Sequence, residues 1–185
     1  MRYVAFLRGI NVGGKALIRM ADLRGCVAEL GHEEVATYIA SGNVLFSSTA
    51  RNGAALERPL ETAIESQFGL DVRVFVRNAR QLNATAKAIP KRWVGNKDLR
   101  CNVIFVAREI DRASLVREFE PKPELEELIR VPGALLWAAK RSALTRSTMV
   151  KLSRHPLYDR MTARNPSTVL ELAKLIRREL SAGPK

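Results

Sequence analysis

The chain has 185 residues, of which 46% are hydrophobic, and it carries 31 Lys and Arg against 19 Asp and Glu, a formal net charge of +12. That length suits one domain or two small halves sharing a core, and no segment approaches the ~18–20 apolar residues of a membrane span. Two cysteines outside any CxxC pair and two histidines without metal-ligand spacing argue against a disulfide scaffold and a dedicated metal site, and no cofactor is expected.

The N-terminal stretch MRYVAFLRGINVGG predicts a first strand at residues 3–7 rather than a signal peptide. Its apolar core breaks at Arg8 and contains no small-residue cleavage site, so a cytoplasmic location is expected. Apolar segments and turn residues predict three further strands in the first half: 35–40, 43–48 and 72–76. Helical periodicity predicts two helices among them: 20–30 and 56–68.

This β-α-β-β-α-β order is that of the ferredoxin-like unit. Asn78 and Gln81 then have the spacing of a capping box. They predict a connecting helix that runs to about Ile89, where Pro90 stops it.

The second half is expected to follow the same order. Residues 102–107 predict a strand, and Asp111 is expected to cap a helix that carries Leu115, Val116 and Phe119. The remaining expected elements are a helix at Glu124–Ile129, a hairpin turn at Val131–Gly133, a strand at 134–139, a helix at 143–153, a strand at 161–163 and a final helix that begins at Asn165-Pro166.

The predicted fold class is therefore α+β, with two ferredoxin-like (βαββαβ) halves whose largely antiparallel sheets carry helices on one face. Three parts are expected: a first half at 1–78, a connecting helix and basic loop at 79–100, and a second half with the C-terminal helix at 101–185.

Charge is unevenly distributed along the chain. Residues 71–101 contain eight basic and two acidic residues, and residues 140–185 contain eleven basic and three acidic ones. The windows 21–70 and 109–127 each contain three basic and seven acidic residues. Such segregation favours a positive surface that attracts nucleic acid or an anionic small molecule, although a basic composition without function stays an alternative.

The loop after the first strand, RGINVGGKA, contains G-x-x-x-x-G-K, the beginning of a phosphate-binding P-loop. The Ser or Thr that binds Mg²⁺ in a P-loop is replaced here by Ala16, and none of the strands predicted in the first half ends in an acidic residue. The predicted antiparallel sheet also differs from the parallel sheet of P-loop enzymes. P-loop NTPase chemistry is therefore not expected.

In a βαββαβ unit, the loop after the first strand lies at the same end as the turn between the second and third strands. The glycine loop and the Ser41-Gly42-Asn43 turn should therefore meet. A glycine-rich backbone with flanking cations can hold an anion without a metal. The alternative is that Gly13 and Gly14 only allow positive φ in a tight connection and that Asn11 caps the loop. The predicted anion-binding residues are Arg8, Asn11, Gly13, Gly14, Lys15, Ser41, Gly42 and Asn43.

A nucleic-acid surface, most plausibly for RNA, is the second hypothesis. It depends on the net charge and on the ferredoxin-like order, a scaffold that RNA-recognition domains share, although fold analogy alone carries little weight. Trp93 is a candidate stacking platform, and the other predicted contacts are basic: Lys91, Arg92, Lys97, Arg100, Lys140, Arg141, Arg146, Lys151, Arg154 and Arg164. No catalytic set is identified, and no membrane partner is expected.

Several separated motifs resemble one bacterial family catalogued as a domain of unknown function, DUF1697. They are LRGINVGG at Leu7–Gly14, the M-x-x-L of Met20–Leu23, the G-x-x-x-V-x-TYI of Gly31–Ile39 and SGNVLF at Ser41–Phe46, together with TARNPSTVLELAKL at Thr162–Leu175. The family usually has Trp after the Arg-Asn pair, where this chain has Pro166. The resemblance implies a two-lobed α+β fold and supplies no reaction and no catalytic residues.

Overall fold

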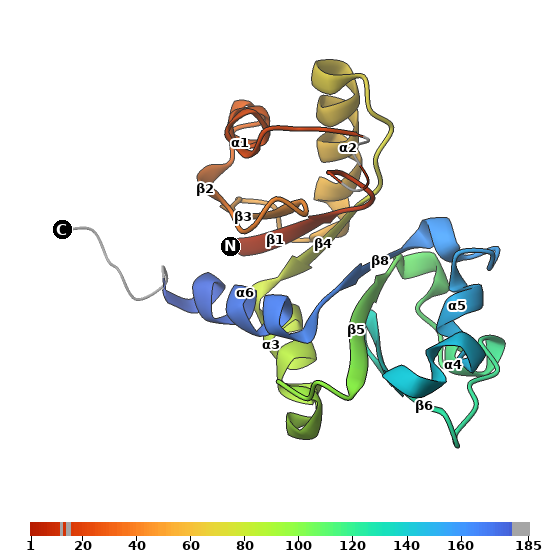
Figure 1. The fold of residues 1–185 in the computed structure, drawn as a ribbon. Helices are drawn as coiled ribbons and strands as arrows, with labels where there is room; N and C mark the ends of the chain where they lie inside the picture. The colour runs from red at the N-terminus through yellow and green to blue at the C-terminus, as the bar shows by residue number, and fades with distance from the viewer. Residues whose placement is uncertain (12, 14–15, 179–185) are drawn as a thin grey trace. The chain divides into compact units, whose positions relative to one another are not determined.

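The computed structural model describes residues 1–11, 13 and 16–178, and the chain divides into two compact units. Among the described residues, the first unit contains 1–82 and 172–178, and the second contains 83–171. Each unit is built on a four-stranded sheet in which neighbouring strands are antiparallel (Figure 1). The expected α+β class with two antiparallel sheets is confirmed.

The sheet of the first unit has the order β2-β3-β1-β4. Its strands are β1 (Arg2–Leu7), β2 (Glu33–Thr37), β3 (Asn43–Ser47) and β4 (Val74–Asn78). All six residues of the central strand β1 are buried, because its side chains alternate between two covered faces. The order is the one that the ferredoxin-like unit produces.

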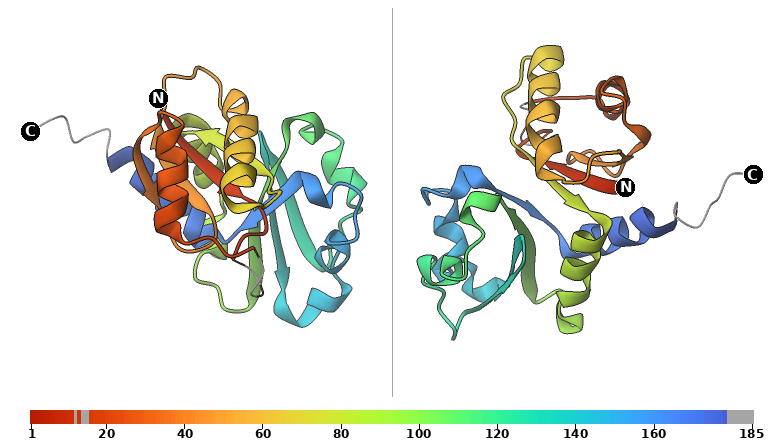
Figure 2. Two further views of the ribbon diagram at one scale, coloured as in Figure 1. Left: turned by 90° about the horizontal axis from the view of Figure 1, so that it is seen from above. Right: turned by 180° about the vertical axis from the view of Figure 1, so that it is seen from behind.

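Two helices cover the face of this sheet that Tyr3, Ala5 and Leu7 present. They are α1 (Met20–Glu29) and α2 (Ala54–Phe68), which lie side by side in Figure 2. Leu60 and Ile64 of α2 are almost completely buried there. Each such side chain contributes roughly 1.5–3 kcal/mol to folding, so the helix is held chiefly by this face.

Helix α2 also protects the outer edge of β4. The backbone N–H groups of Val74 and Val76 donate to the Glu61 and Glu57 carboxylates at 3.0 and 2.9 Å. An unprotected edge strand would offer these donors to another chain. The two glutamates therefore close this side of the sheet.

The sheet of the second unit repeats the same order, as β6-β7-β5-β8. Its strands are β5 (Leu99–Val106), β6 (Glu126–Val131), β7 (Ala134–Lys140) and β8 (Met161–Arg164). Trp137, Leu135 and Ile104 face a core that is closed by two short helices, α4 (Leu115–Glu118) and α5 (Met149–Leu152). The second unit thus keeps the topology of the first with much less helix.

Two longer helices cross the boundary between the units along the chain, α3 (Ala79–Ala88) and α6 (Pro166–Arg178). Short 3₁₀-helices complete the second unit: η1 (Lys91–Trp93), η2 (Arg108–Ile110), η3 (Arg141–Arg146) and η4 (Tyr158–Arg160). The capping box predicted for α3 is confirmed, since the Gln81 N–H donates to Asn78 Oδ1 at 2.9 Å and the Asn78 N–H donates to Gln81 Oε1 at 3.0 Å. Proline at the first position of α6 is confirmed as well.

The predicted helix at Glu124–Ile129 is wrong, because this segment enters strand β6 and pairs with β7. The segment is too short for its apolar pattern to distinguish a helical turn from a strand. It becomes a strand because the hairpin at Gly133, with a φ of 79°, brings it beside β7. The expected Asp111 cap is also wrong. The Asp111 carboxylate instead accepts from the Gly133 N–H at 2.8 Å and from Arg130 at 2.7 Å, and α4 begins only at Leu115.

Two further boundaries differ from expectation. The strand predicted at 35–40 ends at Thr37, because Ile39 has a φ of 51° and leaves the extended conformation. The helix predicted at 143–153 is divided into η3 and α5.

Cys26 and Cys101 are buried free thiols, as the sequence predicts, and burial raises the pKa of each. Within the described chain, no helix is long and apolar enough to cross a membrane. Residues 1–11, 13 and 16–178 contain no group of three His, Cys, Asp or Glu side chains arranged to hold a metal ion.

Candidate functional site

The glycine loop and the β2–β3 turn meet, and Asn11 joins them. Its side-chain amide donates to the carbonyls of Ile18 at 3.0 Å and Ala40 at 2.8 Å, and its Oδ1 accepts from the Ile18 N–H at 2.8 Å. The Leu7 N–H also donates to the Gly42 carbonyl at 2.8 Å. The predicted juxtaposition is therefore present, and the Asn11 side chain is used to hold the loops together.

The turn residues have similar internal roles. The buried Asn43 amide donates to the Tyr38 carbonyl and to Ser41 Oγ, both at 3.0 Å. Gly42 has a φ of 72°, and a Cβ there would lie 2.9 Å from side-chain atoms of Ile10 and Leu7. Gly42 therefore has a conformational role, because a side chain there would be strained and would force Ile10 and Leu7 to shift.

The remaining predicted anion-binding residues divide between the surface and the undescribed part of the loop. Arg8 is half-buried and Gly13 is exposed, whereas Gly14 and Lys15 lie outside the described residues. Ile39, beside Ala40, is 52% exposed and has a φ of 51°, a conformation that β-branched residues rarely adopt. Such strain at an exposed corner is a feature that functional loops share.

Three of the residues predicted to contact nucleic acid form their contacts within the protein instead. Trp93 is only 3% exposed, so it presents no stacking surface, and its Nε1 donates to Glu127 at 3.3 Å. Arg92 donates to both carboxylate oxygens of Glu127 at 2.6 Å. Arg164 is 8% exposed and donates to Thr162 Oγ1 and the Ala163 carbonyl at 2.8 Å. Burial lowers the pKa of Arg164 to about 10, so its guanidinium stays charged at neutral pH inside the protein.

Four other predicted cations come together at one end of the second sheet. The start of β5 pairs with the end of β7, with Leu99 opposite Lys140 and Arg100 opposite Ala139. Arg141 follows, where its N–H donates to the Asp98 carbonyl at 2.8 Å and its Nε donates to the Lys97 carbonyl at 2.9 Å. We call the group of Lys97, Arg100, Lys140 and Arg141 the basic end.

The basic end surrounds two shallow hollows that share Asn96, Leu99 and Arg141. The larger, of about 490 Å³, is lined by Lys97, Lys140 and Asp98. The smaller, of about 190 Å³, is lined by Arg100 and by Asn165 and Ser167 at the start of α6. Asn96, Asn165 and Ser167 are absent from the predicted set, because Asn-Pro-Ser in the sequence indicates a helix start more strongly than a binding site.

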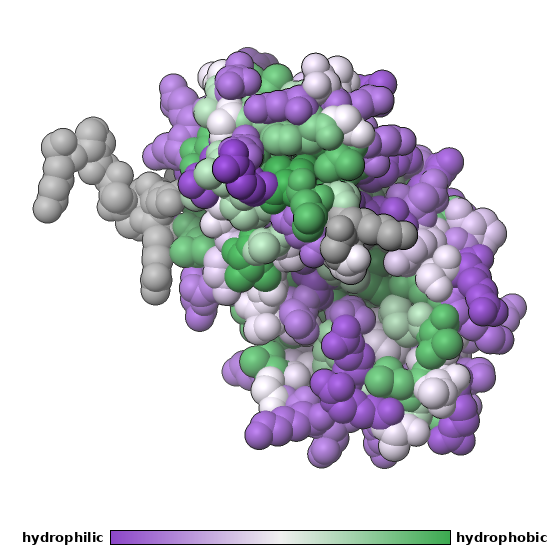
Figure 3. Space-filling view, turned by 45° about the horizontal axis from the view of Figure 1, so that its top comes forward, coloured by the Kyte–Doolittle hydropathy of each residue, from purple (hydrophilic) through white to green (hydrophobic). Residues whose placement is uncertain are grey.

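The side chains of Lys97, Arg100 and Lys140 are exposed and form no ion pair within the part of the chain that the structure describes. Among the described residues that line the two hollows, Asp98 in the larger one is the only carboxylate, so the excess of positive charge is local. In Figure 3, hydrophilic side chains (purple) and hydrophobic ones (green) are mixed over the face in that view. An arrangement of this kind can bind phosphate groups, and it places no nucleophile beside a base for covalent chemistry.

The other predicted cations are not among the residues that line these two hollows. Lys91 is exposed in η1, and Arg146 and Arg154 are exposed on either side of α5. Lys151 of α5 lines a separate pocket.

The two units and their sheets define a class: an α+β protein made of two four-stranded antiparallel sheets with the ferredoxin-like strand order. The family model described as "Protein of unknown function (DUF1697)" matches residues 1–137, so the chain belongs to that family.

A solved structure of the conserved bacterial protein SP0830 from Streptococcus pneumoniae has a similar fold. It is 27% identical to this chain, with a TM-score of 0.81, and the match covers 95% of this chain and 98% of SP0830. A comparison with curated proteins finds no match.

Proposed function

We propose that the protein binds nucleic acid, RNA above all, through backbone phosphates at the basic end. One observation carries the proposal: two cationic segments about 40 residues apart in sequence are paired across β5 and β7, so that their charges converge. Lys97, Arg100 and Lys140 have no ion-pair partner among the described residues, which leaves their charges available to phosphate.

Binding of this kind depends on charge and carries little sequence preference. Trp93 is buried, so base stacking on that ring does not contribute. Phosphates would lie along the larger hollow, where Lys97 and Lys140 flank Arg141. The Arg141 guanidinium is positioned by its bond to the Lys97 carbonyl, which favours a fixed geometry for one phosphate.

The test compares two triple variants that remove equal charge. Lys97→Gln/Arg100→Gln/Lys140→Gln neutralises the basic end, whereas Arg51→Gln/Arg108→Gln/Arg117→Gln neutralises three exposed arginines elsewhere. Fluorescence anisotropy with a short mixed-sequence single-stranded RNA is expected to show a loss of at least tenfold for the first variant and little change for the second. Equal losses would mean that only the overall charge attracts RNA. Absence of binding by the unaltered protein at low salt would eliminate the proposal.

A second candidate function is a small phosphate-bearing metabolite site at the glycine-loop corner, regulatory or enzymatic, without P-loop NTPase chemistry. The strained φ of Ile39 and the adjoining loops favour it. Asn11 and Asn43 are already committed to backbone carbonyls, so the ligand would depend on Arg8, Lys15 and loop N–H groups. The expected result is thermal stabilisation by phosphate-bearing metabolites that Lys15→Ala abolishes. A broad panel that stabilises neither protein would remove this candidate.

A further inference from the structure

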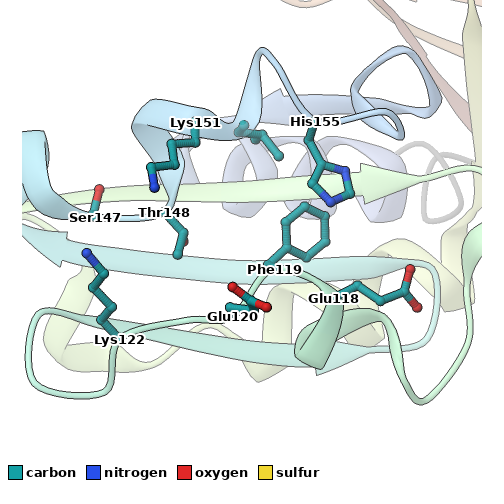
Figure 4. Close-up of a pocket in the computed structure, with 9 residues that line it drawn as sticks. Glu118, Phe119, Glu120, Lys122, Ser147, Thr148, Lys151 and His155 are labelled. Atoms are coloured by element: carbon teal, nitrogen blue, oxygen red, sulfur yellow. The ribbon is translucent and has the colours of Figure 1, made fainter.

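A separate pocket of about 210 Å³ lies in the second unit, between the end of α4 and helix α5. Two apolar side chains, Phe119 and Leu152, contribute to its wall. Polar groups approach it from the segment before β6 and from the segment that leads into α5 (Figure 4). The volume is below the roughly 300 Å³ at which drug-sized sites begin, so a ligand of few atoms fits it.

The buried carboxylate of Glu126 fixes two sides of this pocket. It accepts from the Lys122 N–H at 3.1 Å, from the Thr148 N–H at 3.0 and 3.1 Å and from the Thr148 hydroxyl at 2.9 Å. Trp137 Nε1 donates to the same carboxylate at 2.7 Å. The two segments are therefore held at a set separation before any ligand arrives.

Positive charge gathers at one end of the pocket. Figure 4 shows the Lys122 and Lys151 side chains reaching from opposite sides toward the end where Ser147 lies. The Lys122 ammonium is oriented by a bond to the Arg146 carbonyl at 2.9 Å. Lys151 is exposed and forms no ion pair with the described residues, so its charge is available.

The other end is aromatic. The rings of Phe119 and His155 lie with their centroids 4.6 Å apart and their planes inclined by 35°. The Leu157 N–H donates to His155 Nδ1 at 3.2 Å, which holds the orientation of the ring. A flat apolar group can pack against such a pair.

Carboxylates of the pocket oppose this positive end only weakly. Glu118 is neutralised by Arg112, whose Nη2 and Nε donate to it at 2.7 and 2.9 Å. Glu120, with a φ of 47°, is exposed. The two lysines therefore outweigh the one carboxylate without an arginine partner.

We propose that this pocket binds a small aromatic carboxylate, with the carboxylate between Lys122 and Lys151 and the ring against Phe119 and His155. The proposal is independent of nucleic-acid binding, because the pocket contains none of the four cations of the basic end.

The test uses three probes that share one ring, namely benzoate, benzyl alcohol and benzylamine, measured by ligand-observed NMR on the full chain. Benzoate is expected to bind, and the neutral alcohol and the cationic amine are expected to bind at least tenfold more weakly. Preference for benzylamine would show that Glu120 dominates the site and would overturn the proposal, as would equal binding or no binding of the three.

Variants locate the binding. Lys151→Met is expected to weaken benzoate about tenfold, since it removes one charge-assisted contact and keeps the aliphatic stem. The matched control Lys87→Met removes the same charge from an exposed residue of α3 and should leave benzoate binding unchanged. Glu120→Gln should tighten it a few-fold by removing a like charge. If Lys151→Met and Lys87→Met have the same effect, the ligand lies elsewhere and the proposal fails.

Discussion

The two units share one strand order but hold their segments together with different chemistry. In the first unit a neutral amide, Asn11, joins the loop after β1 to the β2–β3 turn. In the second unit a carboxylate, Glu126, joins the segment before β6 to the segment before α5.

The difference matters because the two groups respond differently to solution conditions. Burial by itself would raise the pKa of the Glu126 carboxyl, but the bonds from Trp137, Lys122 and Thr148 lower it below its usual range. The Asn11 amide has no charge to lose. The same strand order can therefore be stabilised in a pH-dependent or a pH-independent way, depending on whether the side chain that connects the segments is a carboxylate or an amide.

The largest expected effect is that of Glu126→Ala. It leaves Trp137 Nε1 and the N–H groups of Lys122 and Thr148 without their acceptor, which should lower the free energy of unfolding by about 4 kcal/mol. Urea denaturation measures the loss, and hydrogen exchange should place it in the second unit. The exposed neighbour Glu124 provides the control, since Glu124→Ala should change stability by less than about 0.5 kcal/mol. Similar losses in both variants would contradict this role.

Asn11→Ala is next in size. It removes three side-chain hydrogen bonds and places Ala at a φ of 54°, so we expect a loss of about 2–3 kcal/mol, located in the first unit. Asn96→Ala is the matched control. The Asn96 side chain forms one short hydrogen bond with the described residues, in which its Oδ1 accepts from the Asp98 N–H at 2.9 Å. A loss as large in the control would mean that Asn11 does not act as the joint between the loops.

Lowering the pH should distinguish the roles of Glu126 and Asn11 further. Because the folded-state pKa of Glu126 is lowered, the unfolded state takes up the proton first, and the stabilisation is complete only above the ordinary glutamate pKa of about 4.3. The stability difference between the unaltered protein and Glu126→Gln should therefore shrink as the pH falls below that value. The corresponding difference for Asn11→Ala should stay constant, and a parallel decline of both would contradict the assignment.

The smallest expected effect is a gain. Ile39→Gly relieves a strained φ of 51° at an exposed position, and after the entropic cost of glycine it should stabilise the first unit by about 1 kcal/mol. Ile39→Val keeps the β-branched side chain and should give no gain. Destabilisation by the glycine variant would show that the Ile39 side chain stabilises the fold by more than its strained φ destabilises it.

Local patterns predict the first unit well, because each signal is strong within a short window. Leu56, Leu60, Ile64 and Phe68 recur every fourth residue and mark α2, and Gly69 ends that helix with a φ of 66°. The second unit has short helices and a β6 segment whose spacing suits either structure. There the pairing with β7 determines that the segment is a strand. The sequence of one strand alone does not predict such pairing, because it depends on the partner strand.

The candidate sites show a similar limit. Chain order correctly predicts that the glycine loop meets the Ser41–Asn43 turn. The sequence offers an internal role for Asn11 only as an alternative, and the hydrogen bonds of Asn11 favour it. Residue type cannot reveal that Asn43 donates to a backbone carbonyl, or that Trp93 is buried. The pocket beside α5 depends on Lys122 and Lys151, which only the folded chain brings together.

The central claim, phosphate binding at the basic end, is tested most directly by the salt dependence of RNA affinity. Contact with about four phosphates predicts a slope of roughly −3 for log K against log salt with single-stranded RNA. Lys97→Gln/Arg100→Gln/Lys140→Gln should reduce that slope to roughly −1, whereas the control Arg51→Gln/Arg108→Gln/Arg117→Gln should keep it. Equal slopes for the unaltered protein and both variants would contradict the account.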